Sequence, residues 1–189
     1  MKTTRASAYP ALLKYRGNNP GFTLIEFMIT LSTMLLLTGM AFGTFSIYRD
    51  YETTSDINDV LADLYYSRTE ALKRHATITL CRSDDGQSCS RNSDWENGWM
   101  IFTDQNRNRQ VDANDEVLRV SDGLGHEGSL TLGSGYYYYI MFNSTGAAYP
   151  RNTFKLCRPG SKPRAIILFA SGRARVSRLD SGGNSLTCT

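Results

Sequence analysis

The stretch Gly21-Phe22-Thr23-Leu24-Ile25-Glu26 joins a basic segment to a long apolar one. Residues 1–21 carry four basic side chains and no acidic one. After Glu26, the 22 residues from Phe27 to Tyr48 include no charged side chain. An α-helix of that length spans about 33 Å at about 1.5 Å per residue, enough to cross a hydrocarbon core of about 30 Å. The sequence therefore predicts a membrane-spanning helix over residues 22–48.

The segment before this helix differs from an ordinary secretory signal. In such a signal the small residue of the cleavage site follows the apolar run. Here Gly21 precedes the run, and the basic block lies on its N-terminal side. Because positive charge stays on the cytoplasmic side of a membrane, residues 1–21 are expected there and everything after Tyr48 on the other side.

Glu26 places a carboxylate inside the apolar stretch, which is costly in lipid and usually marks a function. A basic leader ending in glycine, then Phe-Thr-Leu-Ile-Glu, then an apolar helix, resembles the class III signal of type IV pilins and type II secretion pseudopilins. The resemblance implies cleavage between Gly21 and Phe22 by a prepilin peptidase, followed by N-methylation of Phe22. It also implies that Glu26 pairs with the amino terminus of a neighbouring subunit during assembly, which gives a buried carboxylate its cation.

The apolar stretch is followed by a second, amphipathic stretch over residues 49–75. The residues that recur there at intervals of three and four positions are Ile57, Val60, Leu61, Leu64, Arg68, Ala71 and Leu72, with Asp56, Asp59, Asp63 and Lys73 between them. Residues that recur every three or four positions lie on one face of a helix, so this pattern predicts a helix with that face packed under a globular head. Residues 76–189 contain short β-like runs separated by glycine-bearing turns, at 77–81, 95–103, 116–120, 136–142, 164–169 and 174–177. We expect an α+β fold of the type IV pilin kind, with a long N-terminal helix packed on a mainly antiparallel β-sheet head.

Several motifs of the predicted head narrow this resemblance. Ser67-Arg-Thr-Glu-Ala-Leu-Lys-Arg74 followed by Thr77-Ile-Thr-Leu-Cys81 is similar to the helix-to-strand junction of the FimT, FimU and GspH group of minor pilins and pseudopilins. The group's central signature resembles Trp95-Glu-Asn-Gly-Trp99-Met-Ile-Phe-Thr-Asp104, and its later turns resemble Phe142-Asn-Ser-Thr-Gly146 and Phe169-Ala-Ser-Gly172-Arg173. The resemblance covers residues 21–178.

The four cysteines, Cys81, Cys89, Cys157 and Cys188, form two widely separated pairs in the sequence. An even number of cysteines in an exported chain favours disulfides over free thiols. Three pairings are possible, and Cys81–Cys89 with Cys157–Cys188 is favoured because it closes the shorter loops.

A loop rich in Asp and Asn offers oxygen atoms at the spacing of a calcium site. Asp104, Asn106, Asn108 and Asp112 take positions 1, 3, 5 and 9 of an EF-hand-like count. Arg109, however, stands where such loops need glycine, and no flanking helices are evident. The preferred interpretation is a polar β-turn held by side-chain hydrogen bonds, with no metal.

Positive charge is concentrated at the C-terminal end. Residues 150–189 contain eight basic side chains and one acidic one, whereas residues 22–149 contain nine basic and 17 acidic ones. Arg173 and Arg175 alternate on a predicted strand, which places both guanidinium groups on one face about 7 Å apart, a spacing comparable with that of phosphates along a DNA strand. Gly-Arg-x-Arg resembles the DNA-contacting motif of FimT proteins of natural competence. The candidate DNA-binding residues are Gly172, Arg173, Arg175, Arg178, Arg164, Lys162 and Arg158.

The favoured function is a minor pilin of a type IV pilus that binds extracellular double-stranded DNA through its phosphates for uptake in natural transformation. The alternatives, without DNA binding, are a FimU-like tip subunit that primes pilus assembly and a GspH-like pseudopilin of type II secretion. No nucleophile–base constellation is visible, so we expect no enzyme, no catalytic residue and no cofactor. The implied partners are other minor and major pilins, the prepilin peptidase and the inner membrane. The head is expected in the periplasm before assembly and on the pilus at the cell surface afterwards.

Overall fold

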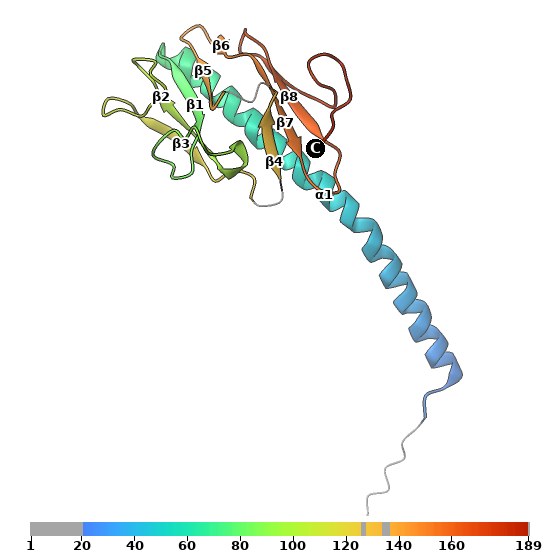
Figure 1. The fold of residues 1–189 in the computed structure, drawn as a ribbon. Coiled ribbons are helices and arrows are strands. Elements are labelled where there is room, and N and C mark those ends of the chain that lie inside the picture. Colours follow the sequence, from blue (N-terminus) through green and yellow to red (C-terminus); the bar gives the residue numbers. More distant parts are fainter. Residues whose placement is uncertain (1–20, 126–127, 134–136, 189) are drawn as a thin grey trace, which may run out of the picture. The chain divides into compact units, whose positions relative to one another are not determined.

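The computed structural model describes residues 21–125, 128–133 and 137–188, without side chains for residues 40–49 (Figure 1). The cleaved leader predicted over residues 1–21 therefore lies, except for Gly21, outside the described residues. The chain divides into two compact units, Met1–Ala41 and Phe42–Thr189. The second unit contains both β-sheets and the candidate site.

A single helix, α1, runs over Leu24–Arg74. Its first turn is capped by the hydroxyl of Thr23, which accepts a hydrogen bond from the backbone N–H of Glu26. Lys73 and Arg74 lie in the last turn, where basic side chains interact favourably with the helix dipole. The helix predicted as two stretches is thus continuous, and it begins two residues after Phe22.

Within the part of the chain that the structure describes, no helix is long and apolar enough to cross a membrane. The span predicted over residues 22–48 includes residues 40–48, whose side chains lie outside that part. The membrane-spanning segment stays a prediction.

The strands found among the described residues form two antiparallel sheets (Figure 1). The five-stranded sheet has the order β3–β2–β1–β5–β6. The bounds of its strands are Val117–Ser121 (β3), Trp99–Thr103 (β2), Ile78–Arg82 (β1), Tyr139–Phe142 (β5) and Ala148–Tyr149 (β6). The four-stranded sheet has the order β4–β7–β8–β9. Its strands are Ser129–Leu132 (β4), Asn152–Cys157 (β7), Arg164–Leu168 (β8) and Ala174–Ser177 (β9).

The α+β fold predicted from the sequence is confirmed, but some details of the strands were wrong or missing. Strands β4, β6 and β7 were not predicted. The run predicted as a strand over residues 95–103 begins with the 3-10 helix η1 at Trp95–Asn97. Gly98 separates η1 from β2 with a φ of 139°, and a Cβ there would lie 2.7 Å from the carbonyl oxygen of Ser121. This close approach of two backbones ends η1 and starts β2.

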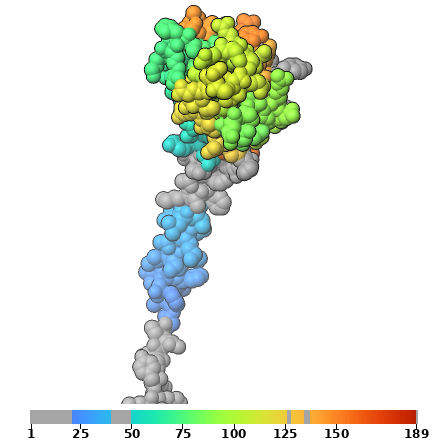
Figure 2. All heavy atoms as spheres, turned by 90° about the vertical axis from the view of Figure 1, so that its left-hand side faces the viewer, coloured from blue at the N-terminus to red at the C-terminus, as the bar shows by residue number. Residues whose placement is uncertain are grey.

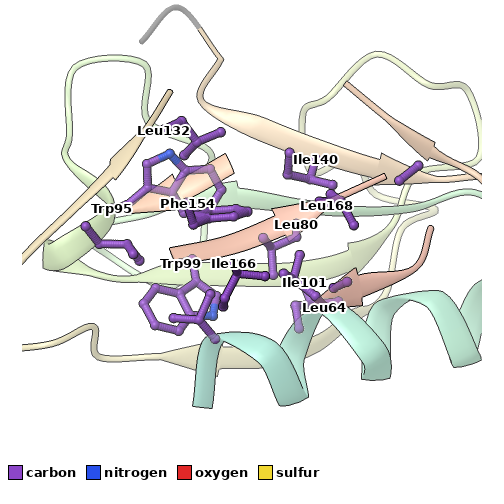
Figure 3. Packing of buried hydrophobic residues seen from close by; sticks show 14 of the residues in the cluster. Leu64, Leu80, Trp95, Trp99, Ile101, Leu132, Ile140, Phe154, Ile166 and Leu168 are labelled. Carbon is purple, nitrogen blue, oxygen red and sulfur yellow. The ribbon is translucent and has the colours of Figure 1, made fainter. Parts of the chain in front are cut away.

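The main core lies between α1 and the inner faces of both sheets (Figure 3). Its helix residues are Ile57, Val60, Leu64 and Ala71, as the periodicity predicts. In Figure 3, Leu64 of the helix lies beside Ile101 and Ile166, which come from different sheets. Trp95 packs edge-on against Phe154 with ring centroids 5.3 Å apart. One helix face therefore holds the two sheets in a single core.

Asp63 is an acidic residue of α1 that is buried rather than solvent-facing. The exposed fraction of Asp63 is 5%. Its carboxylate accepts hydrogen bonds from the indole N–H of Trp99 and from the guanidinium of Arg119, each at 2.7 Å. Because a buried carboxylate needs donors and a cation, these contacts fix the rotation of α1 against β2 and β3.

A second, smaller core covers the outer face of the five-stranded sheet. Cys81, Met100, Phe102, Tyr138 and Tyr139 are buried there. The loops after β1 and β2 pack over them, and Figure 2 looks onto this side, where these loops are coloured green to yellow-green. These loops therefore shield the outer face of β1, β2 and β5.

Acid is expected to weaken the C-terminal end of α1. The buried carboxylate of Glu70 accepts hydrogen bonds from Arg74 at 2.6 Å and Lys73 at 3.3 Å. The bond from Arg74 chiefly holds the pKa of Glu70 below its ordinary value of 4.5, against the effect of burial. A depressed folded-state pKa gives stability that is present above pH 4.5 and lost as the pH falls through the folded-state value.

The variant that tests this role of Glu70 is Glu70→Gln, whose thermal unfolding is measured as a function of pH. We expect the loss of stability below pH 4.5 to be shallower in the variant than in the wild type. Parallel curves for the two proteins would contradict a stabilising role of the Glu70 carboxylate.

Candidate functional site

The hairpin that joins β8 to β9 carries the two arginines of the predicted DNA motif. Gly172 donates its N–H to the carbonyl of Phe169 at 2.9 Å, and Phe169 donates to the carbonyl of Arg173 at 2.9 Å. Arg173 therefore ends the turn, and Arg175 is the second residue of β9. Ala174 between them is buried in the core, so both arginines point to the outer face of the sheet.

The charges of these arginines are open to solvent. Both side chains are exposed, and β9 is an edge strand. Among the described residues, no carboxylate forms an ion pair with Arg173 or Arg175. The guanidinium carbon of Arg175 lies 6.0 Å from the ring centroid of Phe169. Two arginines without acidic partners on one edge form a ready anion-binding surface.

Gly172, one of the predicted DNA contacts, has a packing role in this turn. Its φ is 74°, and a Cβ at this position would lie 1.9 Å from the carbonyl oxygen of Gly146. The same carbonyl accepts a hydrogen bond from Arg68 of α1 at 3.2 Å. The turn that carries Arg173 therefore rests directly on the turn at Gly146 and, through it, on the helix.

Arg158, one of the predicted DNA contacts, is largely buried in ion pairs with the helix. Only 9% of its side chain is exposed. Its guanidinium lies 2.6 Å from the carboxylate of Asp56 and 3.8 Å from that of Glu52, both on α1, and donates to the carbonyl of Leu124 at 3.0 Å. These contacts neutralise the charge of Arg158 and hold the end of β7 to the helix.

The remaining predicted cations lie away from the pair. Lys162 is exposed in the β7–β8 connection, and Arg164 is the first residue of β8. Arg164 has the strand parity of the core residues Ile166 and Leu168, so it faces the side opposite to Arg175. Arg178 is exposed after the end of β9, and it does not share the alternate positions of Arg173 and Arg175. The structure brings together Arg173 and Arg175 and leaves the other three at the far end of the sheet.

Two cations on the outer face were missed by the sequence analysis. Arg151 immediately precedes β7, and Lys155 lies within it. Both point outward because Phe154 and Leu156 of β7 are in the core. The alternation of polar Thr153 and Lys155 with apolar Phe154 and Leu156 was the signal in the sequence that could have revealed this strand and its outward face.

The Asp/Asn loop is a self-contained polar turn. Buried Asp104 accepts hydrogen bonds from the hydroxyl of Thr79 and from the backbone N–H groups of Asn108 and Arg109. Asp112 accepts from the side-chain amides of Asn106 and Asn108. Within residues 21–125, 128–133 and 137–188, no group of three or more His, Cys, Asp or Glu side chains is arranged to hold a metal ion. The hydrogen bonds support the polar-turn interpretation.

Both disulfides favoured by loop length are present. Cys81 is bonded to Cys89, and Cys157 is bonded to Cys188. The second bond fastens the C-terminal segment to the end of β7. Lys155 adds to this attachment by donating to the carbonyl of Thr187 at 3.0 Å.

The predicted processing and assembly residues lie at the start of α1. Gly21 and Phe22 precede the helix, and Glu26 is in its first turn. All three are exposed, and a Cβ at Gly21 would meet nothing within 4 Å. Their roles in cleavage, methylation and assembly stay predictions.

The family described as type II transport protein GspH matches residues 56–172, more than half of the chain. The chain belongs to the GspH family. The match to GspH covers the helix face that forms the core and most of both sheets. It ends at Gly172, so the arginines at 173 and 175 lie outside the stretch that this family shares.

Two further similarities agree with membership of the GspH family. Pilin-like protein PilA1 of Thermus thermophilus is 24% identical over 161 residues, which are 82% of this chain and 97% of that protein. The crystal structure of the type IV minor pilin FimU of Pseudomonas aeruginosa superposes with a TM-score of 0.52 at 22% identity. That superposition covers 69% of this chain and 92% of FimU, and it shows the pilin-like fold.

Proposed function

We propose that this GspH-family protein is a minor pilin of a type IV pilus that binds double-stranded DNA non-specifically for uptake in natural transformation. The observation that carries the proposal is the exposed pair of arginines on the β8–β9 hairpin, which has no acidic partner among the described residues. Arginine suits phosphates because its planar fork of donors binds two oxygens at once. The FimT-like motif of these residues supports the same assignment.

The site consists of Arg173 and Arg175, and Arg178, Arg164 and Lys162 are outlying cations at the far end of the same sheet. Binding to phosphates releases counterions, so affinity should fall steeply with salt and depend little on DNA sequence. Such binding suits a receptor that takes up any DNA the cell meets.

The first test is the double variant Arg173→Gln with Arg175→Gln. We expect weaker binding to duplex DNA and a slope of log affinity against log salt that is smaller by about 1.8, since each lost phosphate contact removes about 0.9. The measurement is fluorescence anisotropy of labelled duplexes with the full-length protein in a non-ionic detergent, over a range of salt concentrations.

The matched control is Arg91→Gln with Arg107→Gln, which removes the same charge from exposed side chains that lie away from β9 and form no ion pair among the described residues. An equal loss in the control would mean that net charge alone acts, and the site assignment would be wrong. Absence of duplex binding by the wild-type protein at low salt would exclude the DNA function.

A structural role without DNA binding is the second candidate, because the family match stops at Gly172 and its description names type II transport. In this case the protein is a tip subunit of a type IV pilus or a pseudopilin of type II secretion. A deletion strain separates these roles: loss of transformation supports DNA uptake, loss of pili supports tip assembly, and loss of enzyme export supports secretion.

Both candidates share the same proposed path to the pilus or pseudopilus. The prepilin peptidase cleaves after Gly21 in the inner membrane, Phe22 is methylated, and Glu26 pairs with a neighbouring pilin. Mass spectrometry of protein from assembled fibres tests this path, because it must yield a mature chain that begins with methylated Phe22.

A further inference from the structure

A groove of about 660 Å³ lies on the outer face of the four-stranded sheet. Strands β7 and β8 form its floor, and part of the C-terminal segment forms one side. The residues that matter for its chemistry are Arg151, Thr153, Lys155, Ile167, Phe169 and Asp180. The disulfide Cys157–Cys188 holds the C-terminal segment beside this groove.

Arg151 and Lys155 line the groove, and Arg175 lies outside it on the neighbouring edge strand β9. In the sheet register, Thr153 pairs with Ile167, and Ile167 pairs with Arg175. Neighbouring strands are about 4.8 Å apart, so the backbone of Arg175 is about 10 Å from that of Thr153. Arg151, two residues before Thr153 on the same face, lines the opposite side of the groove. A chain of negative charges that crosses the strands would meet a guanidinium on each side.

Phe169 supplies an aromatic surface between these cations. It follows β8 on the outer face, lines the groove, and keeps 40% of its surface exposed. The guanidinium of Arg175 lies over its ring, 6.0 Å from the centroid, so a base would stack on the part of the ring that the guanidinium leaves exposed. Exposed aromatics in a cationic groove are the common feature of surfaces that bind single-stranded nucleic acids, where a base stacks on the ring and phosphates meet the cations.

The groove also contains one fixed negative charge. Asp180 accepts hydrogen bonds from the backbone N–H groups of Gly182 and Asn184, each at 2.8 Å. The bond from Asn184 is the main cause that keeps the pKa of Asp180 below its usual range, so it stays ionised. Arg151 and Lys155 still outnumber it, and Arg175 adds a third cation at the edge.

We propose that this groove binds a single strand of nucleic acid, with a base stacked on Phe169 and the adjoining phosphates held by Arg175 and Arg151. The inference rests on the DNA binding proposed above and adds a second mode to it. In a duplex both faces of each base are covered by its neighbours, so Phe169 reaches a base only in a single strand or at a frayed end. Duplex DNA then contacts the arginines of the hairpin, and a single strand also enters the groove.

The test is Phe169→Leu, with Tyr149→Leu as the matched control. Tyr149 is also an exposed aromatic, but it lies on β6 of the other sheet. Anisotropy is measured with a labelled oligothymidine and with a duplex of equal length, using the full-length protein in a non-ionic detergent. Because stacking on one base is worth about 1 kcal/mol or more, Phe169→Leu should weaken oligothymidine binding about fivefold or more. Duplex binding should change by less than about twofold, and the control should change neither.

A second variant tests the phosphate contact across the groove. Arg151→Gln should lower the salt slope for oligothymidine by about 0.7, the value for one contact with a single strand. Thermal unfolding of both variants checks that the sheet is intact.

Each alternative outcome has a distinct meaning. If Phe169→Leu and Tyr149→Leu behave alike with oligothymidine, the groove does not stack bases, and the inference is wrong while duplex binding through Arg173 and Arg175 can still hold. If polyglutamate displaces oligothymidine as well as unlabelled oligothymidine does, the groove recognises charge alone, which also overturns it. If neither nucleic acid binds, the proposed function and this inference fail together.

Discussion

Replacing Gly172 by alanine is expected to lower the free energy of unfolding by about 2–4 kcal/mol. A left-handed φ of 74° costs a residue with a Cβ about 1 kcal/mol. The new Cβ would also lie 1.9 Å from the carbonyl oxygen of Gly146, so one of the two turns must move. Such overpacking typically costs about 1–3 kcal/mol. Thermal unfolding of the full-length protein measures the loss, which should appear as a melting point lower by about 6–12 °C.

Gly160→Ala is the matched control for this variant. Gly160 has a φ of 78°, but a Cβ there would meet nothing within 4 Å. The control therefore isolates the backbone cost of about 1 kcal/mol from the clash. Equal melting points for the two variants would show that Gly172 does not pack as closely as the structure indicates. Because the hairpin must shift in Gly172→Ala, this variant should also bind duplex DNA more weakly than Gly160→Ala.

Arg158→Met is expected to destabilise the protein by about 2–4 kcal/mol and to leave the salt dependence of DNA binding unchanged. Methionine preserves the apolar bulk but leaves Asp56, Glu52 and the carbonyl of Leu124 without their donor. Removing one partner of a buried ion pair typically costs about 3–5 kcal/mol. The cost here should be somewhat lower because the side chains of Asp56 and Glu52 are partly exposed. Urea unfolding measures the stability, and anisotropy measures the salt slope.

Two further variants make this prediction specific. Lys162→Met removes a cation from the same connection, but its exposed side chain has no carboxylate partner among the described residues, so stability should barely change. Arg158→Met combined with Asp56→Leu should regain part of the loss, because the unpaired carboxylate is gone. A lower salt slope for Arg158→Met than for the wild type would show that Arg158 contacts DNA, and this prediction would then be wrong.

These two residues show how the fold sets the position of the candidate site. Gly172 rests on a turn that Arg68 of α1 also holds, and Arg158 ties the end of β7 to Asp56 of the same helix. The edge that carries Arg173 and Arg175 is thus fastened to α1 at both ends of the four-stranded sheet. Rigid placement favours phosphate binding, because less side-chain and backbone freedom is lost when the ligand binds.

The sequence by itself determined the features that depend on local pattern. A recurrence of three and four residues places Ile57, Val60 and Leu64 on one helix face, and short β-like runs predict the strands of an α+β fold. The alternation of Arg173 and Arg175 about Ala174 is also local, because successive side chains of any strand point to opposite faces. Loop length alone favoured the disulfide pairs that the structure contains.

Only the tertiary structure decided what each charged or small residue does. Arg158 and Arg175 belong to the same basic segment, yet one is buried against the carboxylates of α1 and the other is exposed on an edge strand. Gly172 stands within the Gly-Arg-x-Arg motif, but it is needed because the carbonyl of Gly146, 26 residues earlier, occupies the space of a side chain. These differences arise from contacts between segments far apart in the chain, and no pattern along the sequence encodes which carboxylate or carbonyl will lie beside a given residue.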